Sequence, residues 1–317
     1  MAGLHSEPFV ARNLSLCLLL TGSIGLDNVK TPLAEQHDLL GGSASYAAIA
    51  ASFFTPVNLV GIVGEDFPKK YLDLYRKHGV NLDGLEIADG KTFRWSGEYE
   101  SNMNNRRTLS IALNVFEKFN PTLPAQYRNA PFVFLANISP QIQMHVLSQV
   151  AKPKFVVADT MDLWINIAKE ALLELLKKID CLILNESEAR ELMKEASLIK
   201  AGRALLKLGP KFVCIKKGEH GCLLFGKDLF FSAPAFPLED IHDPTGAGDC
   251  FAGAFTGYLA KTGKVNADTL RKAVIYGSVI ASFNVENFSL TRLQTLTPTE
   301  IESRYQSFRQ MSHFELH

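Results

Sequence analysis

Residues 243–255 read Asp-Pro-Thr-Gly-Ala-Gly-Asp-Cys-Phe-Ala-Gly-Ala-Phe, and this stretch decides the expected fold and chemistry. Gly246, Ala247 and Gly248 can expose their backbone N–H groups because no bulky side chain shields them. The small and apolar residues that follow predict a helix, so these amides lie at its N-terminus, where the helix dipole favours anions. Asp249 falls in the first turn, with its carboxylate beside this anion site.

An anion site beside a carboxylate suits phosphoryl transfer. The amides can hold the negative charge that develops on a phosphoryl group, and the carboxylate can take a proton from an attacking hydroxyl. The alternative is a glycine-rich turn capped by an aspartate, since such turns are common before helices. The motif alone leaves both the catalytic and the structural interpretation open.

The composition limits the class of protein. The chain has 317 residues, of which 47% are hydrophobic, and this is enough for one large α/β domain or two small ones. Lys and Arg together number 33, as do Asp and Glu, so the formal net charge is zero. Because no run of basic residues marks a nucleic-acid or membrane surface, we expect no nucleic-acid partner and no membrane partner.

Five cysteines, at positions 17, 181, 214, 222 and 250, lie mostly in apolar runs. An odd number in such settings indicates buried, reduced thiols and therefore a cytoplasmic protein. Leu14–Leu20 could pass for the apolar core of a signal peptide, but it is short and no Ala-x-Ala cleavage site follows. We interpret it as a buried first strand. No apolar run approaches the ~20 residues of a membrane span.

Short apolar runs alternate with helical patterns along the chain. Five runs are typical of buried strands: Asn58–Val63, Phe132–Ile138, Phe155–Asp159, Cys181–Asn185 and Phe212–Lys216. Helical spacing lies between them, at Pro68–His78, Gln141–Val150, Leu163–Lys177 and Leu198–Leu208. This alternation predicts an α/β fold with a mostly parallel sheet and helices on both faces. Because no repeat or flexible linker interrupts the pattern, we expect residues 1–317 to form a single domain.

One segment departs from this rhythm. In Thr92–Glu100 the aromatic residues Phe93, Trp95 and Tyr99 alternate with polar ones, and Thr108–Leu113 alternates again after a turn-like stretch. This period of two predicts a β-hairpin with one apolar face. A hairpin that projects from a parallel core can be a lid over a site at the strand ends, or an edge hairpin that only packs. Both interpretations stay open at this point.

Two more polar sites lie at the ends of predicted strands. Asp27 follows the first strand through Gly22–Gly25, at the carboxyl end, where α/β proteins bind ligands; it can equally be a turn-forming aspartate. Asn185-Glu186-Ser187-Glu188 ends a buried strand, where polar groups could reach phosphates or the water ligands of Mg²⁺. The alternative there is a helix N-cap followed by acidic residues in the first turn.

Two glycine-containing turns carry a similar choice. Gly41-Gly42-Ser43 precedes a helix rich in small residues, and its glycines allow close approach of a ligand or of a neighbouring strand. Lys216-Lys217-Gly218-Glu219-His220-Gly221 joins two strand-like runs as a tight turn, which could accept a nucleotide or simply close a hairpin. Neither the cysteines nor the histidines have the spacing of a metal site.

Taken together, these motifs resemble the PfkB/ribokinase family of small-molecule kinases, nearly from end to end. The family's C-terminal signature matches Asp243–Ala254, and its N-terminal double glycine matches Gly41-Gly42. Its Val-Gly-x-x-Gly-x-Asp block, Asn-x-x-Glu motif and glycine turn match Val60–Asp66, Asn185–Glu188 and Lys217–Gly221. All five motifs stand in the family's order.

The resemblance implies a ribokinase-like three-layer α/β/α fold with a mostly parallel central sheet and a small β lid, formed by about residues 28–40 and 92–113. It also implies an ATP-dependent kinase that phosphorylates a hydroxymethyl group of a small sugar, with a nucleoside kinase as the alternative within the family. Because the related hydroxymethylpyrimidine and pyridoxal kinases lack this lid, the hairpin argues against them.

Two rival functions come from other classes. A non-catalytic sugar or nucleotide sensor could keep the same fold, but a sensor need not retain a base such as Asp249. A nucleotide-linked oxidoreductase is weaker still, because the chain has no dinucleotide-binding fingerprint.

The resemblance assigns roles to individual residues. Asp249 would be the catalytic base, with the amides of Gly246, Ala247 and Gly248 as its anion hole. The acceptor would be held by Asp27, Gly41, Gly42, Ser43, Asn137 and Asp159. ATP would be held by Asn185, Lys216, Gly218, Gly221, Gly246, Gly248 and Glu286. Glu188 would order Mg²⁺ through water, and Asp243 and Thr245 would be the first ligands of K⁺, which several family members bind.

Three stretches depart from the family pattern. Ser43-Ala44-Ser45-Tyr46 follows the double glycine, where many sugar kinases have Asn or Gln a few residues on. Where fructokinase-like members have Asp-x-Asn-x-Arg, this chain reads Asp159-Thr160-Met161-Asp162-Leu163, and the arginine is missing. An acceptor that already carries a phosphate is therefore less expected, although Arg94, Arg106 or Arg107 of the hairpin could replace that arginine. Glu286 stands where a small residue is common, which bears on the nucleotide preference and on the K⁺ ligands. The apolar hairpin face could also join two copies into a homodimer.

Overall fold

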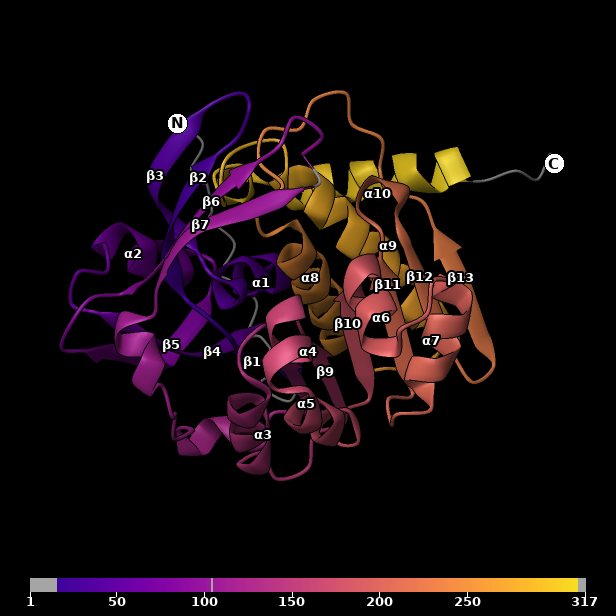
Figure 1. Cartoon of the computed structure of the whole chain (residues 1–317), viewed down its shortest axis with the longest axis horizontal. Coiled ribbons are helices and arrows are strands. Elements are labelled where there is room, and N and C mark those ends of the chain that lie inside the picture. Colours follow the sequence, from indigo (N-terminus) through magenta and orange to yellow (C-terminus); the bar gives the residue numbers. More distant parts are fainter. Residues whose placement is uncertain (1–15, 104, 313–317) are drawn as a thin grey trace, which may run out of the picture.

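The computed structural model describes residues 16–103 and 105–312, which two β-sheets organise (Figure 1). The large sheet has the strand order β13-β12-β11-β10-β9-β8-β1-β4-β5, and the small sheet has the order β3-β2-β6-β7. Figure 1 shows the small sheet, in indigo and magenta, projecting from the body of the molecule. We call it the lid sheet.

The large sheet is mostly parallel. Its strands are β1 (Leu18–Thr21), β4 (Val57–Gly64), β5 (Val80–Ala88), β8 (Phe132–Leu135), β9 (Phe155–Asp159), β10 (Cys181–Asn185), β11 (Phe212–Lys216), β12 (Cys222–Gly226) and β13 (Leu229–Ala233). Neighbours pair parallel except at β12, which pairs antiparallel with both β11 and β13. Parallel strands need long crossover connections, and helices supply most of them here.

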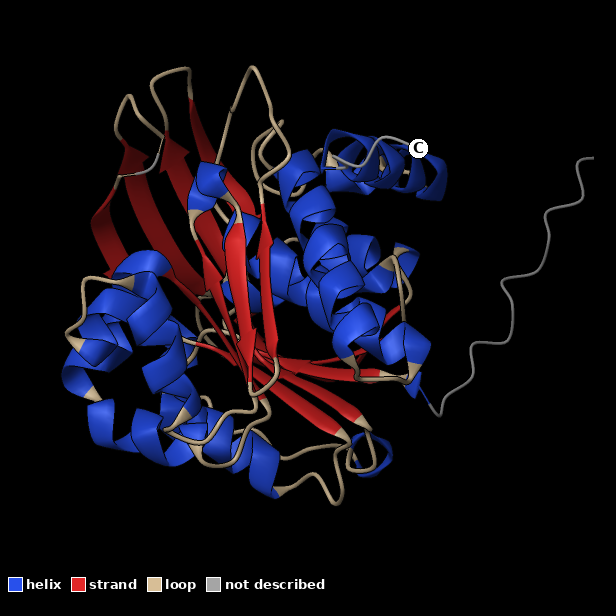
Figure 2. Cartoon of the chain, turned by 90° about the vertical axis from the view of Figure 1, so that its right-hand side faces the viewer, coloured by secondary structure: helices blue, strands red, loops and turns tan. Residues whose placement is uncertain are grey.

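Helices cover both faces of this sheet (Figure 2). One face carries α1 (Ser43–Ser52), α2 (Lys69–Lys77), α8 (Ala247–Thr262), α9 (Ala267–Asn284) and α10 (Pro298–Ser312). The other carries α3 (Pro140–Ser148), α4 (Asp162–Ile167), α5 (Lys169–Leu176), α6 (Glu186–Met193) and α7 (Leu198–Leu206). Leu18 and Leu20 pack into the first core and Leu19 into the second, as alternation along a strand requires. The predicted three-layer α/β/α fold is confirmed.

The lid sheet comes from two separate parts of the chain. Its strands are β2 (Gly25–Lys30), β3 (Glu35–Gly41), β6 (Phe93–Tyr99) and β7 (Arg106–Ala112), so the hairpin predicted over 92–113 forms as β6 and β7. Ser96 pairs with Ser110 whereas Gly97 pairs with Thr108, which leaves Leu109 as the extra residue of a β-bulge.

Asp66, the last residue of the Val-Gly-x-x-Gly-x-Asp block, anchors the base of the lid sheet. One of its oxygens accepts both the N–H and the hydroxyl of Thr92, each at 2.7 Å. The other lies 3.5 Å from the Arg94 guanidinium. These contacts hold the pKa of Asp66 below its ordinary value although burial opposes them. The start of β6 is therefore fixed to the core, while its far end lies over the strand ends.

Two predicted elements differ from the structure. The helix expected over Leu163–Lys177 is broken at Ala168, whose φ of −137° and ψ of 31° lie outside the helical region, so α4 and α5 are separate. The strand expected over Phe132–Ile138 ends at Leu135. The strand does not continue, because a side chain replaces its next backbone partner: the Gln143 amide donates to Leu135 O and Ala136 O at 3.0 and 3.1 Å.

The predictions on cysteines and on the first strand can also be compared with the structure. All five cysteines are buried and free, as predicted. The first strand forms as β1, whereas the beginning of the predicted Leu14–Leu20 run lies outside the described residues. Among the described helices, none has the length and apolar character needed to cross a membrane.

Candidate active site

The carboxyl ends of β9, β10 and β11 lie side by side, and each ends in a polar residue. In the parallel ladders Ile183 pairs with Asp159, and Asn185 pairs with Lys216. Lys216 Nζ lies 3.3 Å from Asp159 Oδ2, and the two side chains are only 17% and 4% exposed. Asp159, expected to hold the acceptor, is thus the ion-pair partner of a residue expected to hold ATP.

The glycine-rich loop forms the N-terminus of α8, as predicted. Gly246 is the N-cap and is left-handed, with φ 75° and ψ 0°. A Cβ atom there would overlap the Tyr46 ring, so only glycine fits. No side chain caps this end of the helix, which leaves first-turn N–H groups available to an anion. The Ala247 N–H is less available, because it donates to Pro244 O at 3.2 Å.

Asp249 lies in the first turn of α8, at this uncapped end. Its carboxylate has no hydrogen-bond or ion-pair partner among the described residues. Burial, and then the charge of Asp159, raises the pKa of Asp249 to about 7, although Lys216 and Arg106 oppose the shift. A carboxylate with such a pKa can lose its proton near neutral pH and then take one from a substrate hydroxyl.

Asp27 lies in β2, close to the double glycine. Its carboxylate fills the space that a Cβ atom on Gly41 would need. Burial, and then the charge of Asp243, raises the pKa of Asp27 to about 8. Its Oδ1 is buried and has no hydrogen-bond partner in the part of the chain that the structure describes. Because buried oxygens are normally satisfied, this atom fits a hydroxyl donor from an acceptor.

Two residues expected to hold the acceptor are engaged within the protein. Ser43 Oγ donates to Asn137 O at 2.9 Å, and Ser43 N–H donates to Ser23 Oγ at 3.0 Å. Asn137 Oδ1 accepts from Trp164 Nε1 at 2.9 Å. These contacts tie the loop after β8 to the start of α1, and a direct contact with the acceptor stays a prediction for both residues.

Asn185 and Glu188 form a capping box at the start of α6. Asn185 Oδ1 accepts from Glu188 N at 2.8 Å, and Glu188 Oε2 accepts from Asn185 N at 2.7 Å. The helix N-cap expected as the alternative is therefore present, and it leaves the predicted binding of Mg²⁺ by Glu188 through water open. Burial, and then Asp159, raises the pKa of Glu188 to about 8. The carboxylates of Asp159, Glu188 and Asp249 all act on the charge of the buried Lys216 ammonium. Three carboxylates against one ammonium leave an excess of negative charge, which suits a hydrated Mg²⁺.

Asp243 holds two loops together behind the glycine-rich turn. Its Oδ1 accepts from Thr245 N at 2.9 Å and its Oδ2 from Ser289 N at 3.0 Å. The side chain is fully buried, and burial raises its pKa. No described cation lies within ion-pair distance of it. A buried carboxylate whose hydrogen-bond partners are all uncharged fits a monovalent cation.

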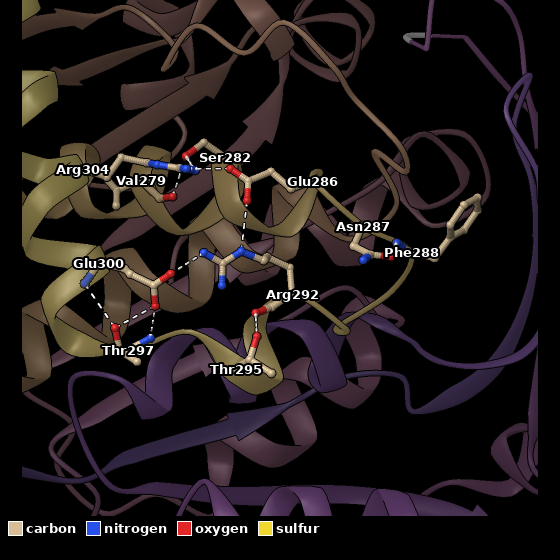
Figure 3. Close-up of polar contacts among 10 residues, drawn as sticks. All are labelled: Val279, Ser282, Glu286, Asn287, Phe288, Arg292, Thr295, Thr297, Glu300 and Arg304. Atoms are coloured by element: carbon tan, nitrogen blue, oxygen red, sulfur yellow. Dashed lines mark hydrogen bonds and ion pairs between the residues drawn. The ribbon is translucent and has the colours of Figure 1, made fainter.

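Glu286 belongs to an ion-pair network (Figure 3). Its two oxygens accept from Arg292 Nε at 3.0 Å and from Arg304 Nη2 at 2.6 Å. Arg292 also donates to Glu300 at 2.6 Å, so the network joins the segment after α9 to α10. Figure 3 shows the Glu286 carboxylate directed toward both arginines. Both oxygens are engaged within the protein, and the predicted contact of Glu286 with ATP stays a prediction.

The turn between β11 and β12 closes an antiparallel hairpin, as one of the two interpretations requires. Gly218 and Gly221 have φ values of 53° and 81°. A side chain on Gly221 would overlap the backbone at Ala233, so this glycine brings two strands together. Binding of a nucleotide at this turn is a prediction that the geometry leaves open.

A contact between the lid sheet and the glycine-rich loop was not predicted from the sequence. Thr245 Oγ1 donates to Tyr99 OH at 3.2 Å, which links β6 to the turn before α8. Arg106 pairs with Tyr99 across the hairpin and therefore lies on the same face. It stands 5.4 Å from the Trp95 ring, and its charge lowers the pKa of both Asp27 and Asp249.

The other two arginines of the hairpin point elsewhere. Arg94 pairs with Asp38 and Asp66, and Arg107 pairs with Glu98. Of the three residues that could replace the missing family arginine, only Arg106 faces the site. Tyr46 belongs to the stretch that departs from the family pattern, but the sequence assigns it no role, although one aromatic side chain within the small-residue run Ser-Ala-Ser-Tyr-Ala-Ala is a usable signal.

Comparison with known proteins decides the family. The model of the pfkB family of carbohydrate kinases matches residues 23–296. The chain belongs to this family. This pfkB kinase is 29% identical over 248 residues to the cytidine kinase of Thermococcus kodakarensis, covering 76% of the chain and 87% of that relative. It is 26% identical over 261 residues to fructokinase-2 of Oryza sativa subsp. japonica, covering 75% and 76%.

Solved structures share the fold of this pfkB kinase. A putative ribokinase II from E. coli, solved in complex with ATP and Mg²⁺, superimposes with a TM-score of 0.74 at 18% identity, covering 92% of this chain and 99% of that one. The predictions of an ATP-dependent kinase, of an alcohol acceptor and of a ribokinase-like fold are confirmed.

The left-handed N-cap gives a first testable prediction. Gly246→Ala should lower kcat at least tenfold and destabilise the protein by roughly 1–3 kcal/mol, because the backbone is strained and the Tyr46 ring must move. Gly263→Ala is the matched control, since Gly263 has φ 63° at the opposite end of the same helix. It should lose stability but keep kcat, as steady-state kinetics and thermal unfolding will show. Equal kcat values in the two variants would contradict a special role for the loop.

Proposed function

We propose that this kinase transfers the γ-phosphoryl group of ATP to the hydroxymethyl group of a small sugar. The observation that carries the proposal is the Asp249 carboxylate, with a pKa of about 7, beside the uncapped N-terminus of α8. Asp27, whose buried Oδ1 lacks a partner among the described residues, lies near enough for its pKa to respond to Asp249. In this proposal a proton acceptor, an anion site and a hydroxyl-binding carboxylate would therefore meet in one place.

In the proposed mechanism Asp27, Gly41 and Gly42 hold the hydroxyl groups of the acceptor. Asp249 takes the proton of the hydroxymethyl group as its oxygen attacks the γ-phosphorus in line. The bond from that phosphorus to the bridging oxygen of ATP breaks, and ADP leaves with the electron pair. The Gly248 amide and the dipole of α8 stabilise the charge on the transferring group.

The remaining residues would hold the nucleotide and its metal. Asn185, Lys216 and the turn at Gly218 and Gly221 would bind ATP. Mg²⁺, held through water by Glu188, would neutralise charge on the phosphates. We also propose K⁺ beside Asp243 and Thr245, where it would compensate a buried carboxylate.

A nucleoside is the second candidate acceptor, and the inner face of the lid sheet favours it. Val29, Tyr99 and Phe288 form a small buried cluster against which Leu39 and Trp95 pack. Leu39 and Trp95 are only partly buried, and the apolar surface that they offer suits a planar base better than it suits sugar hydroxyls. The cytidine kinase among the relatives points the same way.

An acceptor screen tests the proposal. ADP release and thermal shift would be measured with pentoses, hexoses and nucleosides. The proposal expects ADP only when the right acceptor is present. A sensor would show a thermal shift without ADP release, and that result would overturn the proposal.

The lid sheet gives a second testable prediction. Replacing residues 96–110 by a short Gly-Ser turn removes Tyr99 and Arg106 and should open the site to water. We expect ATP hydrolysis to rise relative to acceptor phosphorylation, and the acceptor KM to increase. In the intact enzyme, Trp95 fluorescence should change when acceptor is added. Wild-type coupling and acceptor kinetics in the truncated protein would show that the sheet only packs.

We further propose a homodimer joined through the lid sheet and a cytoplasmic location. Leu109 and Ile111 in β7, and Leu113 just after it, are 50%, 56% and 44% exposed, so these apolar side chains are not covered within one protomer. The five buried, free thiols support a reducing compartment.

A further inference from the structure

Lys216 occupies an unusual position for a buried ammonium group. A Cβ atom built on Gly248 would lie only 2.9 Å from Lys216 Nζ, so the ammonium stands directly over the first turn of α8. The helix presents its positive end there. A cation at that place is repelled by the dipole, and its side chain is only 17% exposed.

Neighbouring carboxylates make this placement tolerable. Asp159 lies 3.3 Å from Nζ, and Glu188 and Asp249 also act on its charge. Thr160, next to Asp159, has a buried hydroxyl without a partner among the described residues. The Lys216 ammonium and the free amides of α8 lie next to each other, so an anion bound there would satisfy both, and the unpartnered Thr160 hydroxyl follows directly on the aspartate that holds the ammonium.

We propose that Lys216 is a catalytic residue which donates a hydrogen bond to the transferring phosphoryl group, and that Asp159 is the positioning residue which holds its ammonium over Gly248. This inference rests on the proposed function and deepens it. Lys216 stabilises charge that moves onto the phosphoryl and leaving oxygens, in addition to holding bound ATP. A Cβ atom on Gly248 would come within 2.9 Å of Lys216 Nζ, so a side chain there would shift the ammonium from this place.

The test compares Lys216→Met, Lys216→Arg and Asp159→Asn, at the carboxyl ends of the strands, with one control variant at the opposite ends. Lys216→Met should lower kcat by about 10²–10³-fold, with the acceptor KM changed less than about threefold. Lys216→Arg should recover part of kcat. Lys211→Met is the matched control, because Lys211 precedes the same strand, pairs with Asp180 at 2.7 Å and is 72% exposed. It should keep wild-type kcat.

The pH dependence of kcat/KM separates catalysis from a structural role. The charge of Lys216 lowers the pKa of Asp249, and the charge of Asp159 raises it. Lys216→Met should therefore move the acid limb to higher pH, whereas Asp159→Asn should move it to lower pH and reduce kcat about tenfold. A variant that had merely lost structure would not give opposite shifts.

Each outcome supports or overturns the inference. Wild-type kcat in Lys216→Met, or a rise in its ATP KM alone, would overturn the role of Lys216. The proposed function would still be supported in that case if Asp249→Asn is inactive. Active Asp249→Asn would overturn the proposed function itself. If Lys216→Met does not fold, Lys216→Gln and Asp159→Asn replace it in the test, because both remove a charge that acts on Asp249, and unshifted pH profiles in both would refute the role.

Discussion

Replacing Asp249 by Asn is expected to lower kcat by a factor of about 10²–10⁴ while ATP binding changes little. Asparagine keeps the size and polarity of the side chain but cannot accept the proton of the acceptor. In the wild type, kcat/KM should fall as pH drops below about 7, because the protonated acid cannot act as a base. Steady-state kinetics from pH 5.5 to pH 9 and ATP calorimetry measure both effects.

The same substitution should stabilise the fold. Since the folded-state pKa of Asp249 is raised to about 7, ionisation of the folded protein costs free energy, and stability falls as pH rises from the ordinary aspartate pKa toward 7. Asp249→Asn should therefore unfold at a higher temperature than the wild type at pH 8. Asp268→Asn, in the exposed first turn of α9, is the control and should change neither kcat nor this pH dependence. Asp249→Asn with kcat within threefold of the wild type would refute the assignment.

Replacing Asp27 by Ala is expected to weaken acceptor binding by roughly 1.5–3 kcal/mol at about pH 9, where the Asp27 carboxyl, whose pKa is about 8, is ionised and its hydrogen bond is charge-assisted. The physical reason is the buried Oδ1, which has no partner among the described residues and so awaits one from the acceptor. ATP affinity should not change, because the side chain lies against Gly41 and not at the residues proposed to bind ATP. Calorimetry with each ligand alone measures the two affinities.

Asp38→Asn supplies the control for Asp27→Ala. Asp38 lies in the same sheet, is 63% exposed and pairs with Arg94 on the outer side, and asparagine tolerates its φ of 51°. This variant should bind both ligands as the wild type does. Loss of ATP affinity with acceptor affinity intact in Asp27→Ala would reverse the assignment of the two halves of the site.

The features that could be predicted from the sequence are those encoded by short stretches of neighbouring residues. The glycines before α8, the period-two hairpin and the short apolar strands are each encoded within a dozen residues, so α8, β6 and β7 and most of the sheet were foreseeable. The break at Ala168 was not, because apolar spacing continues through it and only the backbone angles change.

Contacts between distant residues account for what the sequence missed. The ion pair of Lys216 with Asp159 joins positions 57 apart, and the bond from Thr245 to Tyr99 joins positions 146 apart. Ser43 matches a binding motif, yet its hydroxyl is engaged with the backbone of Asn137. A motif gives the kinds of groups present, whereas only the fold decides which of them remain free for a ligand.

Identification of the phosphorylated product tests the central claim most directly. Purified protein would be incubated with ATP, Mg²⁺ and each sugar or nucleoside, and ADP formation and the site of the new phosphate would be followed by ³¹P and ¹³C NMR. The account predicts one ADP per phosphorylated acceptor, with phosphate on a hydroxymethyl oxygen, and no product with Asp249→Asn. Acceptor-independent ADP formation, or a product that forms equally with Asp249→Asn, would contradict it.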